Sequence, residues 1–225
     1  MPFVADAQSF NVDVDVEFAP PQLGGGVPSS SFGAAANQPG VWHRLYYGWG
    51  AENLTDIHGN VTSVQISDAN GGSGSAYNVP INTGDFALLL NDARDTGRFG
   101  ESFSFSLSGL TNGPYKVYVY AVAVQTVTQA LPARTRVTQS INPGDQIITG
   151  PMPGNSFAQG ITHSIHDVIA SNGSLDIQVM GDNPLGSNIN GFQIVQVPEP
   201  QQIISFSIPS LIVIGQVFRS RKGGT

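Results

Sequence analysis

The sequence predicts a single all-β domain, a sandwich or a barrel, followed by a distinct tail. Three observations predict it. The 225 residues include 27 glycines and 15 prolines but only 11% charged residues, a composition typical of short strands joined by tight turns. Apolar and polar residues alternate in several segments, and no segment has a convincing amphipathic helical pattern. The 8–196 region is long enough to bury a sizeable core.

The first predicted strand covers residues 10–18. Its apolar residues fall on one face, because successive side chains of a strand point to opposite sides. Asn11 and the acidic residues Asp13, Asp15 and Glu17 fall on the other face. The pattern therefore predicts a half-buried strand with a solvated acidic face, and the Pro/Gly/Ser-rich residues 19–31 that follow are expected to form a loop that packs little.

The rest of the domain reads as strands separated by turn residues. Phe103, Phe105 and Leu107 alternate with serines and are expected to point inward. Residues 85–90 form a short apolar run, and we find no internal repeat. The further predicted strands are residues 60–67, 102–107, 115–124, 134–141, 146–149, 160–169, 174–179 and 188–196.

Two stretches together resemble known jelly rolls. Residues 103–122 read as a strand, a Ser-Gly-Leu turn and a Pro-Tyr start to a Val/Tyr strand, and residues 173–196 end in Ile-Asn-Gly-Phe-Gln-Ile. This pairing is similar to the galactose-binding-like and malectin-like jelly rolls of secreted bacterial proteins. The resemblance implies a jelly-roll β-sandwich of about 8–10 antiparallel strands, as short strands joined by turns also favour. These motifs indicate core strands and turns, and they do not indicate which ligand the domain binds.

The last 29 residues have a three-part pattern. Val197, Pro198, Glu199 and Pro200 come first, and the two prolines end the domain before them. The apolar run 203–218 would span about 24 Å as a helix, slightly short of a hydrocarbon core. Basic residues follow it directly, as Arg219, Arg221 and Lys222. The positive-inside rule places such a basic end in the cytoplasm.

This order resembles the PEP-CTERM sorting signal of exported bacterial proteins. The resemblance implies a short C-terminal sorting helix in residues 197–225, held transiently in the inner membrane. An exosortase-type protease-transpeptidase would then cut near Val197–Pro200 and deliver the domain to the cell surface or outside. An amphiphilic last strand or a plain tail anchor is the alternative. Residues 1–7 end in Ala5-Asp6-Ala7, a small-x-small pattern expected of a signal-peptide remnant.

Charge and motifs exclude several function classes. Six basic and fifteen acidic residues precede Val197, a net charge of −9 that argues against nucleic-acid binding. His163 and His166 lie three apart on a predicted strand and so face opposite ways, which argues against a shared metal. No nucleophile elbow or phosphate-binding loop is present, and we expect no enzyme activity. The chain contains no cysteine, so no disulfide staples the fold.

Two groups of side chains are candidate binding residues. Trp42, Tyr46, Tyr47 and Trp49 form the densest aromatic cluster and could stack on sugar rings, although such residues between glycines are more often part of a core. Asp13, Asp15 and Glu17 could hold a structural Ca²⁺, as jelly rolls of this resemblance often do, if a loop adds carbonyl oxygens; otherwise they are a solvated face. No other cofactor is expected.

The function predicted first is a non-enzymatic surface or extracellular-matrix protein, sorted through its tail and associated with exopolysaccharide or biofilm. A carbohydrate-binding module that uses the Trp42–Trp49 region is the alternative. A self-assembling structural subunit is a second alternative, because exposed strand edges can pair between chains.

Overall fold

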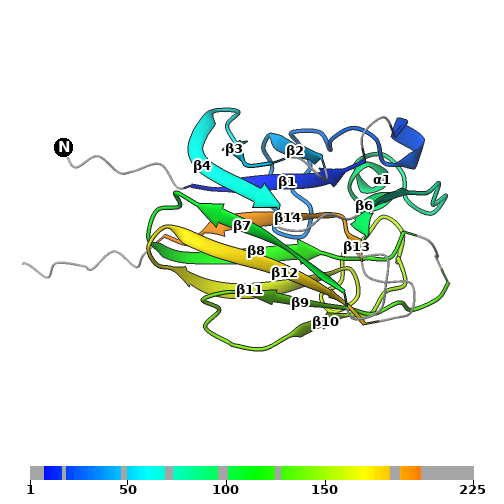
Figure 1. The fold of residues 1–225 in the computed structure, drawn as a ribbon. Helices are drawn as coiled ribbons and strands as arrows, with labels where there is room; N and C mark the ends of the chain where they lie inside the picture. Colours follow the sequence, from blue (N-terminus) through cyan, green and yellow to red (C-terminus); the bar gives the residue numbers. More distant parts are fainter. Residues whose placement is uncertain are drawn as a thin grey trace, which may run out of the picture.

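The computed structural model of this chain describes residues 8–16, 19–46, 50–68, 73–95, 101–124, 128–182 and 188–198. These residues form a β-sandwich in which two large sheets pack face to face, as Figure 1 shows. The predicted all-β sandwich is thus confirmed. No helix among the described residues is long and apolar enough to cross a membrane.

The two large sheets and one small sheet account for all the described strands. The five-stranded sheet has the order β11 (His163–Ala170), β8 (Gly113–Tyr120), β14 (Gly191–Gln196), β1 (Phe10–Asp15) and β2 (Trp42–Tyr46). The six-stranded sheet has the order β10 (Gln146–Ile148), β9 (Ala133–Val137), β12 (Ser174–Gly181), β7 (Ser102–Ser108), β4 (Val61–Asp68) and β3 (Glu52–Thr55). The small sheet has the order β13 (Asn188–Ile189), β6 (Asp92–Asp95) and β5 (Ser73–Ala76). The pairings between these strands are antiparallel, except that of β1 with β2, which is parallel.

The core lies between the two large sheets. Phe103, Phe105 and Leu107 on β7 are buried and alternate with serines, as the pattern predicts. The Phe105 ring lies 5.7 Å from that of Phe192 on β14, so the two sheets meet through aromatic contacts. The predicted last core strand is therefore confirmed, because β14 lies between β8 and β1.

Two sequence predictions about the first strand are wrong. Asn11, Asp13 and Asp15 are buried, so the polar face of β1 is not solvated. The reason lies in the chain after it. From the loop 19–31, Gly26 N donates to Asp15 Oδ2 at 3.1 Å, and beyond that loop the Gln38 carbonyl accepts from Asn11 Nδ2 at 3.1 Å. The Pro/Gly/Ser-rich loop therefore covers β1 instead of packing little.

Two short helices lie at the end of the sandwich where β1 finishes (Figure 1). They are η1 (Pro21–Leu23), a 3-10 turn, and α1 (Asp85–Leu90), an α-helix in the short apolar run. The described chain begins and ends at the opposite end of β1, where Gln8 N donates to Gln196 Oε1 at 2.6 Å. About 20 Å of strand separates the two ends, at roughly 3.3 Å per residue.

Candidate functional site

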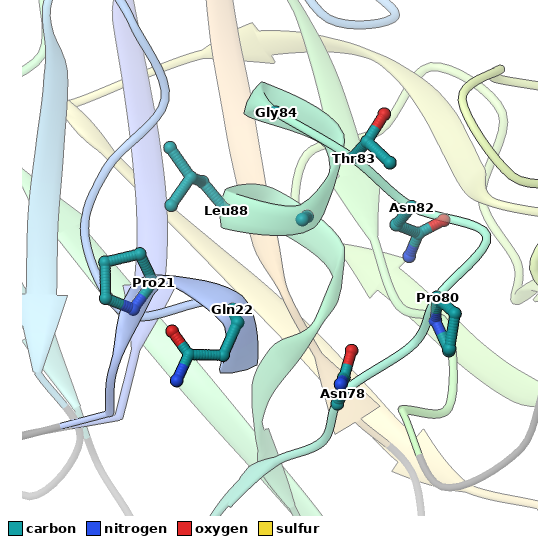
Figure 2. A pocket seen from close by; sticks show the side chains of 9 residues that line it. Pro21, Gln22, Asn78, Pro80, Asn82, Thr83, Gly84 and Leu88 are labelled. Carbon is teal, nitrogen blue, oxygen red and sulfur yellow. The ribbon is translucent and has the colours of Figure 1, made fainter.

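A pocket of about 500 Å³ opens between η1, the segment before α1, and α1 itself. Figure 2 shows its walls: Pro21 and Gln22 on one side, Asn78, Pro80 and Asn82 opposite, and Leu88 above. This volume is in the range of small-molecule sites. The full lining is Pro21, Gln22, Asn78, Pro80, Asn82, Thr83, Gly84, Ala87 and Leu88.

Local sequence explains both helical walls. Pro21 opens η1 with the restricted φ that suits a first turn, and Gly24 ends it in the left-handed region at φ 94°, where a side chain would be strained. Gly84 precedes α1 at φ 56°, and Asp85 in the first turn suits the positive end of a helix. The Pro/Gly composition that predicted a loop thus makes one wall of the pocket.

A chain of amides holds the pocket floor. Asn82 Nδ2 donates to Asn91 Oδ1 at 2.8 Å, and Asn91 Nδ2 donates to the Gln22 carbonyl at 3.5 Å. These bonds orient the Asn82 amide, which is 4% exposed. Its Oδ1 accepts no hydrogen bond from any residue that the structure describes. A buried acceptor without a donor is unfavourable, so a ligand hydroxyl or a water that reached it would be bound favourably.

The chemistry of the lining is neutral and mixed. Amides and one hydroxyl can donate and accept hydrogen bonds, while Pro21, Pro80 and Leu88 offer apolar surface. None of the described residues that line the pocket has a charged side chain. Tyr77 and Ile81, next to lining residues in the chain, are 45% and 44% exposed. Such a pocket suits a small neutral polyhydroxylated ligand that has both hydroxyls and C–H faces.

Three buried carboxyl groups lie behind the η1 wall. Asp13, Asp15 and Asp92 are each at most 1% exposed. Arg44 Nε donates to Asp15 Oδ2, and Val16 N donates to Asp92 Oδ2 at 3.1 Å. Among the described residues, no N–H or hydroxyl group donates to four of the six carboxyl oxygens, which are Asp13 Oδ1 and Oδ2, Asp15 Oδ1 and Asp92 Oδ1.

Burial perturbs the titration of this acid cluster (Asp13, Asp15 and Asp92). Loss of hydration raises the pKa of Asp92 to about 11, and the neighbouring charge of Asp13 and a hydrogen bond with Asp15 add to the effect. Burial also raises the pKa of Asp13 well above its usual value; Asp15 adds to this, and Arg44 opposes it. Asp92 is therefore a neutral acid at pH 7, and burial shifts the pKa of Asp13 in the same direction.

Two of the three predicted Ca²⁺ ligands, Asp13 and Asp15, belong to this acid cluster. Within the described residues, no three histidine or acidic side chains are grouped so that they could hold a metal ion. Glu17 lies outside those residues, so the predicted set of Asp13, Asp15 and Glu17 cannot be placed as a whole, and the Ca²⁺ site stays a prediction.

The aromatic cluster is not an exposed platform at its described positions. Trp42 is 4% exposed, its ring lies 6.1 Å from that of Phe32, and its Nε1 donates to the Phe32 carbonyl at 3.1 Å. Tyr46 is half-buried, with the Arg44 guanidinium 4.6 Å from its ring centre. The core interpretation therefore applies to Trp42, because the loop around Phe32 covers it. Tyr47 and Trp49 lie outside the described residues.

The sorting residues are described only at their start. Val197 N donates to the Pro114 carbonyl at 2.9 Å, so the domain continues one residue past β14. Pro198 is the last described residue, and Glu199, Pro200, Arg219, Arg221 and Lys222 lie outside the described part.

The two histidines behave as predicted: His163 and His166 lie on β11 and have different partners. His163 packs beside Tyr120 and His166 bonds Thr135.

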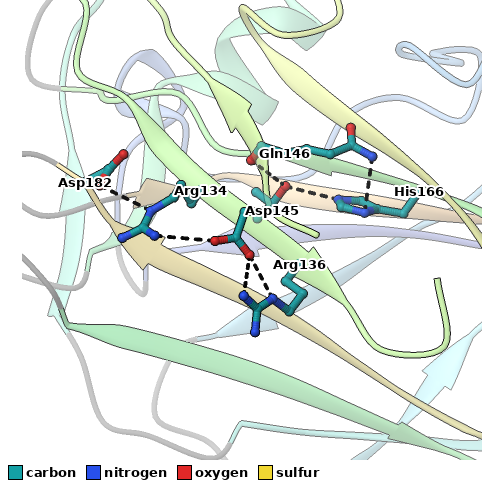
Figure 3. A network of polar contacts seen from close by, with 7 residues as sticks. Arg134, Arg136, Asp145, Gln146, His166 and Asp182 are labelled. Carbon is teal, nitrogen blue, oxygen red and sulfur yellow. Dashed lines mark hydrogen bonds and ion pairs between the residues drawn. The ribbon is translucent and has the colours of Figure 1, made fainter. Parts of the chain in front are cut away.

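A second, smaller groove of about 230 Å³ crosses the outer face of the six-stranded sheet. Ser104, Gln178 and Arg136 lie in one row there, from β7, β12 and β9. Arg136 is already engaged, because its Nη2 and Nε bond Asp145 at 2.7 and 2.8 Å, as Figure 3 shows. The side chains that line this second groove are all polar, so the groove lacks the apolar surface of the first pocket.

Sequence reasoning missed the pocket. Its lining residues come from two segments about 60 positions apart, and none belongs to a motif. Prolines and amides between strands are ordinary turn residues, so only the clustering of Asn78, Asn82 and Asn91 could have given a weak signal.

Comparison with known proteins supports the fold. No family model matches the chain, and no curated protein matches it in sequence. The ANXUR1 extracellular domain from Arabidopsis thaliana superposes with a TM-score of 0.51 and 12% identity, over 86% of this chain and 49% of that one. This chain therefore spans about half the length of that structure.

Two carbohydrate-binding modules superpose less well. One is a family 61 module in complex with β-1,4-galactotriose, with a TM-score of 0.32 and 16% identity over 60% of this chain and 90% of that one. The other is a family 35 module from Cellvibrio japonicus, with a TM-score of 0.31 and 14% identity over 46% of this chain and 71% of that one. Superpositions at this level assign no residue here to a binding site. What the ANXUR1 similarity shows is a shared β-sandwich fold.

Proposed function

We propose that this protein binds carbohydrate in the pocket between η1 and α1. The observation that carries the proposal is the buried, unpaired Asn82 Oδ1 in an uncharged lining of amides, one hydroxyl and proline faces. Sugar hydroxyls supply donors for such an acceptor, while their C–H faces suit proline and leucine surfaces. Because Trp42 is buried, we place the site in this pocket and not at the Trp42–Trp49 cluster, which the sequence offered for the carbohydrate-binding alternative.

The position of the pocket supports a role at a surface. The described chain ends at Pro198, at the end of the sandwich opposite η1 and α1. A domain attached through residues that follow Pro198 would therefore present the pocket away from its attachment. We include the sorting tail in the proposal: the chain is exported, processed by an exosortase-type enzyme, and displayed on exopolysaccharide or in a biofilm matrix.

Glycan-array screening of the purified chain, followed by calorimetry on the best neutral oligosaccharide, tests the binding proposal. Gln22→Ala and Asn78→Ala each remove an exposed amide from the pocket. We expect each to weaken binding by about 2- to 10-fold, which corresponds to the loss of one hydrogen bond. Gln178→Ala, in the second groove, is the matched control and should leave the affinity unchanged. If Gln178→Ala abolishes the binding seen on the array and Gln22→Ala leaves it unchanged, the binding site lies on the outer face of the six-stranded sheet instead.

The sorting part has a separate test. Intact-mass measurement and fractionation of the protein from its native host should find a mature form that ends near Val197–Pro200, outside the inner membrane. A full-length form retained in the inner membrane would make the tail a simple anchor and remove the exosortase from the proposal.

Self-association is a second candidate, and exposed isoleucines on two edge strands favour it. Ile147 on β10 and Ile169 on β11 are 51% and 53% exposed, at the outer strands of the two large sheets. These strands lie near one another, since Ile165 N on β11 donates to Gln146 Oε1 on β10 at 3.2 Å. Sedimentation of the chain should show a concentration-dependent dimer that Ile147→Lys removes; a monomer at every concentration would count against it.

A further inference from the structure

We propose that the pocket between η1 and α1 recognises a 2-acetamido sugar, with Asn82 accepting from the N–H of the acetamido group and Thr83 donating to its carbonyl oxygen. The inference rests on the proposed carbohydrate site and names the class of sugar that the site takes. Both residues line the pocket, and they are neighbours on the segment before α1, as Figure 2 shows.

Asn82 presents only an acceptor to the pocket. The two hydrogens of its Nδ2 are both used, because this nitrogen donates to Asn91 Oδ1 at 2.8 Å and to Met152 Sδ at 3.0 Å. Its Oδ1 is left without a donor among the described residues. Since the side chain is buried, this empty acceptor is unfavourable, and a ligand that binds there must bring a donor to it.

Thr83 presents a donor to the pocket. Asn155, on the loop 150–157, contacts it twice: Asn155 Oδ1 accepts from Thr83 N at 2.8 Å, and Asn155 Nδ2 donates to Thr83 Oγ1 at 2.6 Å. The Thr83 oxygen is the acceptor of this second bond, so its own hydrogen is left to donate elsewhere. Thr83 is exposed, and a ligand oxygen in the pocket can accept that hydrogen.

An acetamido group is complementary to this pair. Its N–H is a donor, its carbonyl oxygen is an acceptor, and its methyl group is apolar. Pro80, Ala87 and Leu88 line the same pocket and supply apolar surface for the methyl group. A hydroxyl at the same ring position can fill one polar place, but it brings no methyl group to cover this surface. The acetamido group therefore uses more of the lining than a hydroxyl does.

The donor and the acceptor are held in place by a second loop. The loop 150–157 contacts the pocket segment through Met152 and Asn155, and its Phe157 ring stacks on that of Phe86 in α1 at 4.8 Å. Fixed side chains lose less conformational entropy on binding than free ones. A fixed order of donor and acceptor also disfavours sugars whose groups do not match it.

Calorimetry of the full chain with matched sugars tests the proposal. Chitotriose and cellotriose differ only at C2 of each ring, where the first has an acetamido group and the second a hydroxyl. We expect chitotriose to bind about 10-fold more tightly, from one added hydrogen bond and a buried methyl group. N-acetylgalactosamine and galactose repeat the comparison for a ring of the other configuration at C4.

Variants of Thr83 test the assigned donor. Thr83→Val removes the hydroxyl at nearly constant volume, and the ratio of the two affinities should fall by about 2- to 10-fold. Thr83→Ser keeps the hydroxyl and should restore the ratio. Thr138→Val, at an exposed position in the second groove, is the matched control and should behave like the wild type. A general loss of pocket structure would weaken both sugars and leave their ratio unchanged.

The outcomes separate this inference from the proposed function. Equal affinities within both pairs of sugars would overturn the acetamido preference and leave carbohydrate binding in place. A preference that Thr83→Val leaves at its wild-type value would overturn the role of Thr83. If no sugar binds on the array or in the calorimeter, the proposed function and this inference are both wrong.

Discussion

Asn82 donates its side-chain amide to Asn91 Oδ1 at 2.8 Å, which ties a pocket-lining residue to the residue just before Asp92. Through this bond the pocket floor and the acid cluster share one segment of chain. The pocket-lining amides and the buried carboxyl groups are thus parts of one structural unit at the end of the sandwich.

Replacing Asn82 should reduce stability as well as binding. Asn82→Ala removes the donor to Asn91 Oδ1, a residue that is 1% exposed, and leaves a buried acceptor unpaired. We expect a loss of about 1–3 kcal/mol in the free energy of unfolding, measured by urea denaturation. Asn78→Ala, at an exposed position in the same pocket, should change it by less than about 0.5 kcal/mol. Equal effects of the two substitutions would show that the Asn82 amide is not held as described.

Replacing Trp42 should affect stability and spare carbohydrate binding. Trp42→Phe removes the hydrogen bond from Nε1 to the Phe32 carbonyl and some buried ring surface. We expect the unfolding free energy to fall by about 1–3 kcal/mol while the affinity for any bound oligosaccharide stays the same. Calorimetry of the folded variant separates the two effects. A large loss of affinity without a loss of stability would support the hypothesis that the aromatic cluster around Trp42 binds the sugar.

Acid should destabilise the protein through its buried histidines. Burial lowers the pKa of both His163 and His166 to about 4. In the unfolded chain each titrates near 6.5, so the stability is present above that pH and is lost as the pH falls toward 4. Thermal melts at successive pH values should show this decline, and His166→Gln should make it shallower. His58→Gln, at an exposed position, is the control that should leave the slope unchanged.

Truncating the central aromatic contact should be among the most costly core changes. Phe105 is 1% exposed and contacts Phe103 and Phe192 at ring distances of 5.9 and 5.7 Å. Phe105→Ala should lower the unfolding free energy by about 3–5 kcal/mol. Ile147→Ala, at a 51% exposed position, should change it by less than about 0.5 kcal/mol. Denaturant titration of both variants measures the contrast.

A side chain at Gly25 should disrupt the η1 wall. A Cβ there would lie 1.6 Å from the Ala19 carbonyl oxygen, so the backbone must move. We expect Gly25→Ala to cost about 1–3 kcal/mol or more in stability and to weaken carbohydrate binding. Gly50→Ala is the matched control, because nothing lies within 4 Å of a Cβ at that position. Unchanged binding in Gly25→Ala would show that the pocket does not need this wall.

Strand patterns predicted most of the fold, because alternation reports burial wherever only one face of a strand is covered. Phe103, Phe105 and Leu107 are such a case. The same rule failed for β1, where the alternation is as clear but both faces are buried. Periodicity cannot show that a distant loop will cover a polar face. The short α1 also escaped prediction, because an apolar run of six residues fits a strand or a helix equally well.

Composition, alternation and turn residues act locally, so they were enough to predict an all-β sandwich followed by a distinct tail. The position of the pocket, in contrast, follows from the tertiary structure. It buried Trp42 under the Phe32 loop, placed Asp92 beside Asp13 and Asp15, and joined Gln22 and Asn82 in one pocket. These contacts join segments that lie tens of residues apart in the sequence. Long-range packing brings the segments together, and no local pattern of residues predicts it.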